Sequence, residues 1–372
     1  MSIDFKSLAV PGVRALSPYQ PGKPIEEVAR ELGLAPSEII KLASNENPLG
    51  PSAKALAAAK AALDDMCLYP DGNGFILKQK LAERLSVSTD QLTLGNGSND
   101  VLELVIRAFA GPGDEVVFSQ YAFAVYPIST QAVGATGISV PARNWGHDLD
   151  AMAAAITDRT RIVFVANPNN PTGTALGQAA IESFLNRVPE HVVVVLDEAY
   201  GEYFEGDEFP DGASMLPRHP NLVVARTFSK AWGLAALRVG YAVSSADIAD
   251  VINRVRQAFN VDTVALSAAT AVLDDDDYLQ RSREVNRVGL RQLAEGFEKL
   301  GLAYIPSSGN FIAVDVGRDA ESVFQGLLRH GVIVRPIGGY GMPNHLRISV
   351  GLADENARCL DALKQVLESA DG

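Results

Sequence analysis

RIVFVANPNNPTG, at residues 161–173, is an apolar run that ends in a polar loop. HVVVVLDEAY at 191–200 and NLVVARTFSK at 221–230 repeat this arrangement. The apolar residues of the three runs barely alternate with polar ones, which is typical of strands buried on both faces of a parallel sheet. A helical segment near 176–187 separates the first two runs, and strands separated by helices imply βαβ crossovers. The sequence therefore predicts an α/β fold with a mainly parallel central sheet flanked by helices.

The pattern changes toward both ends of the chain. Five prolines punctuate the first 40 residues, which contain one short helical stretch at 25–32, so we expect an arm there and not a domain. Beyond residue 265 the helices and strands form a second set that suits a smaller α+β domain. We expect an N-terminal arm at 1–40, a large domain at 41–265 and a small C-terminal domain at 266–372. The other predicted elements are helices at 52–63, 99–109, 265–300 and 320–329, and strands at 92–95, 114–118, 311–316, 331–336 and 346–351.

The composition excludes several classes of protein. Of the 372 residues, 47% are hydrophobic and 21% are charged, as in a globular chain with a large core. The 32 basic and 45 acidic residues give a net charge of −13, which argues against broad nucleic-acid binding. Cys67 and Cys359 form no CxxC pair and the five histidines lack ligand spacing, so we expect neither a disulfide framework nor a metal. We also expect a cytoplasmic protein, because we find no apolar run of membrane-spanning or signal-peptide length.

Polar side chains that could bind a ligand or take part in catalysis follow each of the three strands. Ligands of an open parallel sheet bind beyond the carboxyl ends of its strands, so these side chains should meet at one place. Lys230 is the candidate nucleophile, because a buried amine near positive charge is partly neutral and can form a Schiff base; the alternative is an exposed loop lysine. Asp197 suits a protonated pyridine nitrogen, or else a structural salt bridge or helix cap. Asn170 and Tyr200 could donate to a phenolate oxygen, although NPTG also fits a turn and Tyr200 a half-buried aromatic residue.

A glycine-rich turn offers an anion site. GNGSND at 95–100 follows a strand and opens a helix, whose first backbone N–H groups can bind an anion; a simple helix cap is the alternative. Asp100 stands where a GxGxxG motif has its third glycine, and no GK[ST] follows, so the turn is neither a dinucleotide fingerprint nor a P-loop. Tyr121 could stack on a flat ring or pack in the core. Polar donors close to the candidate lysine in the sequence are Thr227, Ser229 and Arg238.

These motifs resemble those of the fold-type I aminotransferases, which use pyridoxal phosphate (PLP). The resemblance is carried by TFSKAWGLAALRVGY at 227–241, NPNNPTG at 167–173 and DEAY at 197–200. It extends over nearly the whole chain, from residue 17 to residue 351. Four further segments are similar to the histidinol-phosphate aminotransferases in particular, namely LASNENPLGPS at 42–52, YPDGNG at 69–74, LGNGSNDVLELVIRAF at 94–109 and PSSGNFIAVD at 306–315.

The resemblance implies roles for residues around the cofactor. Lys230 would form the Schiff base with PLP and then act as general base and acid, while Asp197 would pair with the pyridinium nitrogen. Asn170 and Tyr200 would bind the ring's phenolate oxygen, and Tyr121 would stack on the ring. The cofactor phosphate would be held by Ser98, Asn99, Thr227, Ser229 and Arg238.

The resemblance also implies partners for the chain. Tyr69 would reach the phosphate of the neighbouring subunit's cofactor, which implies a homodimer. Arg335 and Arg347 would bind the anionic group of the substrate, with Tyr19 closing over it from the arm.

The implied reaction is transamination between L-histidinol phosphate and 2-oxoglutarate, which gives imidazole acetol phosphate and glutamate in histidine biosynthesis. A broad or aromatic amino acid aminotransferase is the first alternative. A PLP-dependent threonine-phosphate decarboxylase and a non-catalytic PLP-binding regulator are the others. The regulator would need a fused DNA-binding segment, for which the Pro-rich arm is too short.

Overall fold

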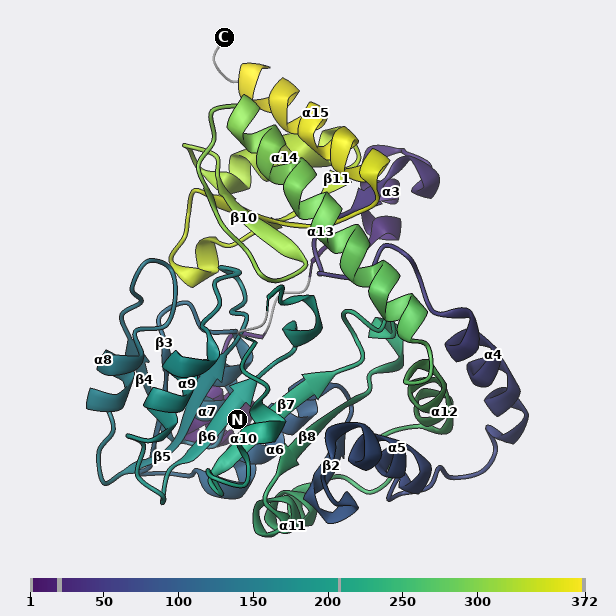
Figure 1. The fold of residues 1–372 in the computed structure, drawn as a ribbon. Helices are drawn as coiled ribbons and strands as arrows, with labels where there is room; N and C mark the ends of the chain where they lie inside the picture. Colours follow the sequence, from purple (N-terminus) through teal and green to yellow (C-terminus); the bar gives the residue numbers. More distant parts are fainter. Residues whose placement is uncertain (1–2, 19–21, 207–208, 370–372) are drawn as a thin grey trace.

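A seven-stranded sheet lies at the centre of the larger part of the chain in the computed structural model, which describes residues 3–18, 22–206 and 209–369 (Figure 1). The strands are β2 (Leu92–Gly95), β3 (Glu115–Ser119), β4 (Thr136–Val140), β5 (Thr160–Ala166), β6 (Val193–Asp197), β7 (Leu222–Thr227) and β8 (Gly240–Ser244). Their order across the sheet is β2-β8-β7-β6-β5-β3-β4. All neighbours are parallel except β8, which runs opposite to β2 and β7. The predicted α/β fold with a mainly parallel sheet is confirmed.

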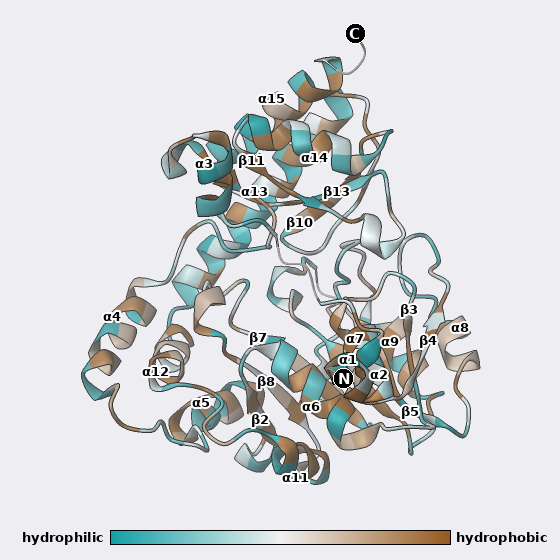
Figure 2. Cartoon of the chain, turned by 180° about the vertical axis from the view of Figure 1, so that it is seen from behind, coloured by the Kyte–Doolittle hydropathy of each residue, from teal (hydrophilic) through white to brown (hydrophobic). Residues whose placement is uncertain are grey.

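Both faces of this sheet are buried, which explains the unbroken apolar runs. Val194 and Leu196 of β6 belong to one hydrophobic core, while Val193 and Val195 face a second core on the opposite side. Figure 2 shows these hydrophobic strands enclosed by helices. The helices are α4 (Ala53–Ala62), α5 (Phe75–Leu85), α6 (Ser98–Phe109), α7 (Val125–Ala132), α8 (Leu149–Ala154), α9 (Gln178–Leu185), α10 (Gly212–Met215), α11 (Ala246–Val255) and α12 (Thr263–Val272). Residues of α6, α7 and α11 line the second core, and the other six helices contribute to the first or cover it.

A smaller antiparallel sheet forms the upper part of the molecule in Figure 1. Its strands are, in order, β12 (Arg335–Pro336), β13 (His345–Ser349), β10 (Phe311–Asp315) and β9 (Tyr304–Ile305). Three helices pack with it, α13 (Asp276–Lys299), α14 (Ala320–Arg329) and α15 (Ala353–Ser369). The same core takes in residues from near the N-terminus, because α3 (Ile25–Leu32) packs on it and β1 (Ile40–Lys41) pairs in parallel with β11 (Val332–Ile333).

Two predicted elements are divided in the structure. The helical stretch expected at 265–300 consists of α12 and α13, because Asp275 caps a new helix by accepting a hydrogen bond from the backbone N–H of Tyr278. The strand expected at 331–336 is two short strands, and β11 and β12 belong to different sheets. Sequence reasoning also missed β4, which forms one edge of the large sheet, and β8, its single antiparallel strand among the described residues.

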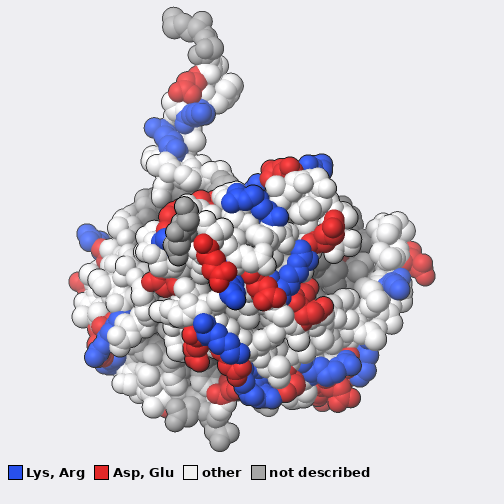
Figure 3. Space-filling view, turned by 90° about the horizontal axis from the view of Figure 1, so that it is seen from above, with Lys and Arg blue, Asp and Glu red and all other residues white. Residues whose placement is uncertain are grey.

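The N-terminal segment projects from the body of the molecule. It contains α1 (Phe5–Leu8) and α2 (Pro11–Arg14), and Figure 3 shows it extending beyond the edge of a face on which basic and acidic side chains are intermixed. Phe5 is 75% exposed and Leu8 is 68% exposed. The segment touches the large sheet's helices through Gln131 of α7, whose Nε2 donates to the carbonyl of Gly12 at 3.2 Å. In the described part of the chain, no helix is long and apolar enough to cross a membrane.

Candidate active site

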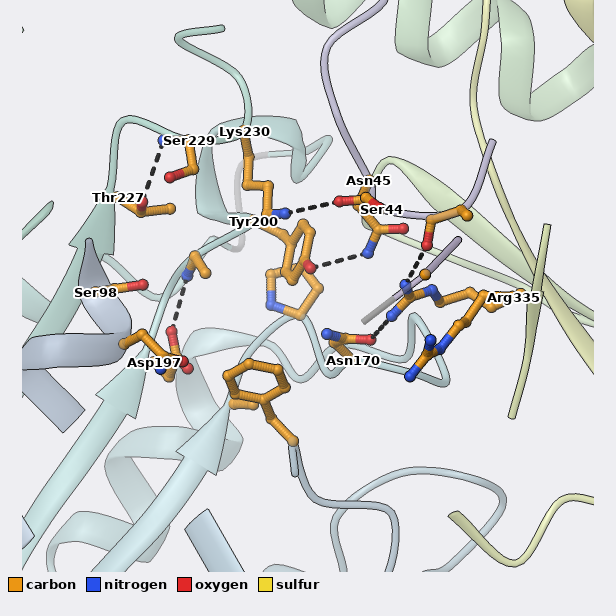
Figure 4. Close-up of a pocket in the computed structure, with 18 of the residues that line it drawn as sticks. Ser44, Asn45, Ser98, Asn170, Asp197, Tyr200, Thr227, Ser229, Lys230 and Arg335 are labelled. Carbon is orange, nitrogen blue, oxygen red and sulfur yellow. Dashed lines mark hydrogen bonds between the residues drawn. The ribbon is translucent and has the colours of Figure 1, made fainter. Parts of the chain in front are cut away.

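A cavity lies where the carboxyl ends of β5, β6 and β7 face the small sheet (Figure 4). The polar clusters that follow the three strands therefore meet, as the strand pattern predicts. Residues from four parts of the chain line the cavity: Asn170, Asp197, Tyr200, Thr227, Ser229, Lys230 and Arg238 beside the large sheet, Ser98 and Asn99 at the start of α6, Ala43, Ser44 and Asn45 after β1, and Arg335 and Arg347 on the small sheet.

The Lys230 amine points into this cavity. Its Nζ donates a hydrogen bond to the carbonyl of Ser44 at 3.1 Å and lies 5.7 Å from the ring centroid of Tyr200. Burial, and after it the positive charges of Arg347 and Arg238, lower the pKa of Lys230 to about 8 against an opposing effect of Glu46. A minor fraction of this amine is therefore uncharged near neutral pH, far more than for an ordinary lysine, and this fraction can act as a nucleophile or a proton carrier.

Asp197 places a carboxylate at the end of β6. It is 5% exposed, and burial raises its pKa. Two donors counteract this effect, since the Tyr126 hydroxyl lies 2.7 Å from Oδ2 and the backbone N–H of Ala199 lies 3.2 Å from Oδ1. A buried carboxylate held in this way suits a cationic ligand atom. Sequence reasoning missed Tyr126, because a tyrosine inside a helix gives no sign of which acid its hydroxyl will meet.

Asn170 and Tyr200 are each held by a neighbour. Asn170 Oδ1 accepts a hydrogen bond from Arg347 Nη1 at 2.6 Å, which leaves its amide nitrogen to act as a donor. Tyr200 Oη accepts from Asn45 Nδ2 at 2.9 Å. Burial raises the pKa of Tyr200 to about 12, so its hydroxyl is protonated at neutral pH and can donate.

An anion cradle lies at the start of α6. Gly97 precedes this helix with a φ of 79°, and a Cβ at this position would collide with the Arg238 guanidinium, so glycine is needed for the arginine to approach. Arg238 Nη1 donates to Ser229 Oγ at 3.1 Å. The helix N-terminus, the guanidinium and the hydroxyls of Ser229 and Thr227 line the same end of the cavity, and such a donor set suits a phosphate.

Two arginines line the cavity from the small sheet. Arg335 and Arg347 are opposite each other in the antiparallel pairing of β12 with β13. Arg347 is 7% exposed, and its Nη2 donates to the carbonyl of Ala43 at 2.8 Å. Its buried Nε has no hydrogen-bond partner among the described residues, so one donor remains for a ligand.

Two aromatic side chains, Tyr200 and Phe123, line the cavity in the described chain. The resemblance predicts Tyr121 at the cavity, but it is not one of the described residues that line it, whereas Phe123 is. The Tyr121 ring packs against Trp145, with 5.4 Å between ring centroids. YAFAVY at 121–126 offers three aromatic residues, and the sequence alone does not rank them.

Of the other expected residues, Tyr69 does not line its own chain's cavity, and Tyr19 is not described. Tyr69 is 84% exposed and stacks on Phe259, with 4.8 Å between ring centroids, so it faces away from its own chain's site. Tyr19 lies outside the described residues. Sequence reasoning also missed Ser44 and Asn45, which stand in a loop with no catalytic residue type.

Taken together, the polar groups of the cavity fit PLP. It offers a phosphate cradle at one end and, elsewhere in its wall, a buried carboxylate for the ring nitrogen and a partly uncharged amine for the aldehyde carbon. Asn170 and Tyr200 add two donors for the ring oxygen.

Comparisons with known proteins agree with this geometry. The family model of class I and II aminotransferases matches residues 37–363. Histidinol-phosphate aminotransferase 2 of Pseudomonas aeruginosa is 65% identical over 364 residues, covering 98% of this chain and 99% of the relative. Histidinol-phosphate aminotransferase 1 of Thiobacillus denitrificans is 59% identical and covers 98% and 94%.

A solved structure extends the likeness to three dimensions. The histidinol-phosphate aminotransferase from Sinorhizobium meliloti, in complex with pyridoxal-5'-phosphate, superposes with a TM-score of 0.89 at 31% identity, covering 97% of each chain. With the family model spanning most of its length and relatives this similar throughout, the chain belongs to the class I and II aminotransferases.

Proposed function

We propose that this protein is a PLP-dependent aminotransferase that transfers the amino group between L-histidinol phosphate and 2-oxoglutarate, giving imidazole acetol phosphate and glutamate in histidine biosynthesis. The names of its relatives support this substrate. The structural observation that carries it is the pairing of Arg335 with Arg347 beside the cavity that contains Lys230.

The residues that would hold the cofactor divide by chemistry. Arg238, Ser229 and Thr227, with Ser98 and Asn99 at the helix start, would bind the phosphate. Asp197 would pair with the ring nitrogen, and Asn170 and Tyr200 would donate to the ring oxygen. We assign ring stacking to Phe123 in place of Tyr121, because Phe123 lines the cavity.

The chain's own residues move the protons. When bound, PLP supplies an electron-withdrawing ring that stabilises negative charge on the carbon beside the substrate's nitrogen. Lys230, with its pKa lowered to about 8, could take the proton from that carbon as general base and, as general acid, deliver it to the former aldehyde carbon of the cofactor, which is the shift that transamination needs. The Asp197 carboxylate would keep a proton on the ring nitrogen, and the Tyr126 hydroxyl holds this carboxylate in place.

Two arginines match the charge of the substrate's anion. A phosphate near neutral pH carries close to two negative charges, and arginine pairs with phosphate oxygens through two parallel hydrogen bonds. Arg347 would bind the anion of either substrate, and Arg335 would add the second positive charge that the phosphate needs.

The surface around Tyr69 supports a homodimer. Tyr69 is 84% exposed, and neighbouring apolar side chains are exposed as well, including Met66 at 70% and Leu68 at 65%. A monomer that shows so much apolar surface in one segment is expected to bury it against a partner. Tyr69 of each subunit would then reach the cofactor phosphate of the other, and the projecting N-terminal segment would pack on the partner. The closing role of Tyr19 and a cytoplasmic location remain predictions.

A donor panel tests the proposed function. Purified protein loaded with PLP is given 2-oxoglutarate and one donor at a time, and glutamate is measured. We expect kcat/KM to be highest with histidinol phosphate and lower with phenylalanine, tyrosine and aspartate. A preference for phenylalanine would replace the proposal with an aromatic aminotransferase. Release of carbon dioxide from threonine phosphate without glutamate would indicate a decarboxylase, and no turnover with any donor would indicate a binding protein.

A further inference from the structure

Asn45 is a buried residue in a rarely adopted backbone conformation beside the cavity. It is 1% exposed and has a φ of 54°, in the left-handed region that asparagine tolerates better than most residues. It directly follows Ser44, whose carbonyl accepts the hydrogen bond from Lys230. Four hydrogen bonds engage its backbone N–H, its backbone carbonyl and both polar atoms of its side chain. The surrounding structure therefore specifies this residue closely.

These hydrogen bonds connect the small sheet to Tyr200. The backbone N–H of Asn45 donates to Ser349 Oγ at 2.8 Å, and Ser349 Oγ lies 2.9 Å from Asn45 Oδ1. Asn45 Nδ2 in turn lies 2.9 Å from Tyr200 Oη, as Figure 4 shows. Ser349 ends β13, whereas Tyr200 follows β6 of the large sheet.

The chemistry of the groups determines which atom donates and which accepts in each of these hydrogen bonds. A backbone N–H can only donate, so Ser349 Oγ accepts it and must give its own proton to another atom. Ser349 is 3% exposed, and in the described chain Asn45 Oδ1 is the acceptor for its hydroxyl. A flipped amide would leave that buried proton without an acceptor, which is costly. The amide nitrogen therefore faces Tyr200, so Tyr200 Oη accepts and its own proton is free to point into the cavity.

We propose that Asn45 and Ser349 are positioning residues that keep the Tyr200 hydroxyl oriented as a donor toward the ring oxygen of the bound cofactor. This inference rests on the proposed function, because it needs PLP in the cavity. A donor held toward an ionised oxygen favours the ionised form and does not have to reorient during the reaction. A strand of the small sheet would thus set the acidity of a cofactor bound mainly by the large sheet.

Two substitutions at Asn45 separate orientation from packing. Asn45→Asp keeps the size of the side chain but replaces the amide donor by a second acceptor, so the Tyr200 proton should turn toward the carboxylate. Asn45→Gly suits the positive φ and removes the amide without offering an acceptor, so Tyr200 can still donate to the ring. The readout is the pH dependence of the absorbance of bound PLP. Asn45→Asp should raise the apparent pKa of this transition by about one unit, a tenfold change in proton affinity, and Asn45→Gly should raise it less.

A double-mutant cycle with Tyr200→Phe isolates the path through the hydroxyl. The new carboxylate also adds a charge, which persists when Tyr200 is removed, so the part of the shift that disappears in the Tyr200→Phe background belongs to the hydroxyl. We expect most of the pKa shift caused by Asn45→Asp to disappear in the Tyr200→Phe background. An equal shift in both backgrounds, or equal shifts for Asn45→Asp and Asn45→Gly, would overturn the inference.

Ser349 gives an independent test that leaves Asn45 in place. Ser349→Ala frees the amide to flip and should raise the apparent pKa, while Ser349→Thr retains the hydroxyl and should restore the wild-type value. If Ser349→Ala leaves the transition unchanged, the inference fails, even where the Asn45 variants do not fold. Wild-type protein that binds no PLP would instead overturn the proposed function. Wild-type protein that binds PLP and transaminates, with variants that do not shift the transition, would overturn only the positioning role.

Discussion

Replacing Lys230 should make the cofactor-free protein more stable at neutral pH. Burial, with neighbouring positive charges, lowers the pKa of this lysine from 10.5 to about 8, so its charged form costs folding free energy. This difference in pKa corresponds to at most about 3.5 kcal/mol of folding free energy. Lys230→Met keeps the length of the side chain and removes the charge, so it should recover most of this free energy.

The pH dependence gives this prediction its sign. Below pH 8 the lysine is protonated in both the folded and the unfolded protein, so the cost is fully present. Between pH 8 and 10.5 the unfolded chain binds more protons than the folded one. The free energy of unfolding of the wild type therefore rises with pH relative to that of the variant. The advantage of Lys230→Met should therefore be largest at pH 7 and small at pH 10.

Urea unfolding of cofactor-free protein at the two pH values measures this difference, with all proteins at one concentration. Lys60→Met on the exposed face of α4 is the matched control, and its difference from wild type should not change with pH. If Lys230→Met is no more stable than wild type at pH 7, or if its advantage persists undiminished at pH 10, the account of a destabilised charged amine is refuted.

Further substitutions test the assigned roles. Asp197→Asn should lower turnover by roughly 10²-fold or more in a steady-state assay, because the ring nitrogen would hold its proton less firmly; a wild-type rate would mean that the carboxylate is only structural. Arg347→Ala should lower kcat/KM for every donor. Arg335→Ala should lower it for histidinol phosphate roughly 10- to 150-fold more than for phenylalanine, and equal losses would contradict the second cation's role. Mixing inactive Lys230→Ala protein with impaired Tyr69→Phe protein should restore part of the activity through shared sites, whereas sedimentation of a stable active monomer would exclude them.

The parts of the site that sequence predicts are those tied to strand ends. Asp197 and Lys230 follow buried apolar runs directly, and a parallel sheet brings the carboxyl ends of its strands to one edge, so their meeting follows from topology. Arg335 and Arg347 lie on adjacent strands of the small sheet for a similar reason, since a short connection allows antiparallel neighbours. These placements need only the hydrophobic pattern and the order of the elements.

The parts that sequence does not predict depend on packing between distant segments. Phe123 lines the cavity and Tyr121 does not, because the loop after β3 turns one ring toward Trp145. Asn45 reaches Tyr200 across 155 positions of the chain, in a loop whose composition carries no catalytic signature. The division of residues 265–300 into two helices depends on a single cap at Asp275 within an acidic run. Such features are set by tertiary contacts that no local pattern encodes.

The most direct test of the proposed reaction is its first half, followed by absorbance. PLP-loaded protein is mixed with histidinol phosphate alone, and 2-oxoglutarate is added afterwards. We predict that the near-visible absorbance of the bound cofactor disappears with one equivalent of imidazole acetol phosphate formed per site, and that 2-oxoglutarate restores it with one equivalent of glutamate. Lys230→Ala should bind PLP and show neither step at the wild-type rate. An absorbance that histidinol phosphate leaves unchanged while phenylalanine abolishes it would contradict the proposed substrate.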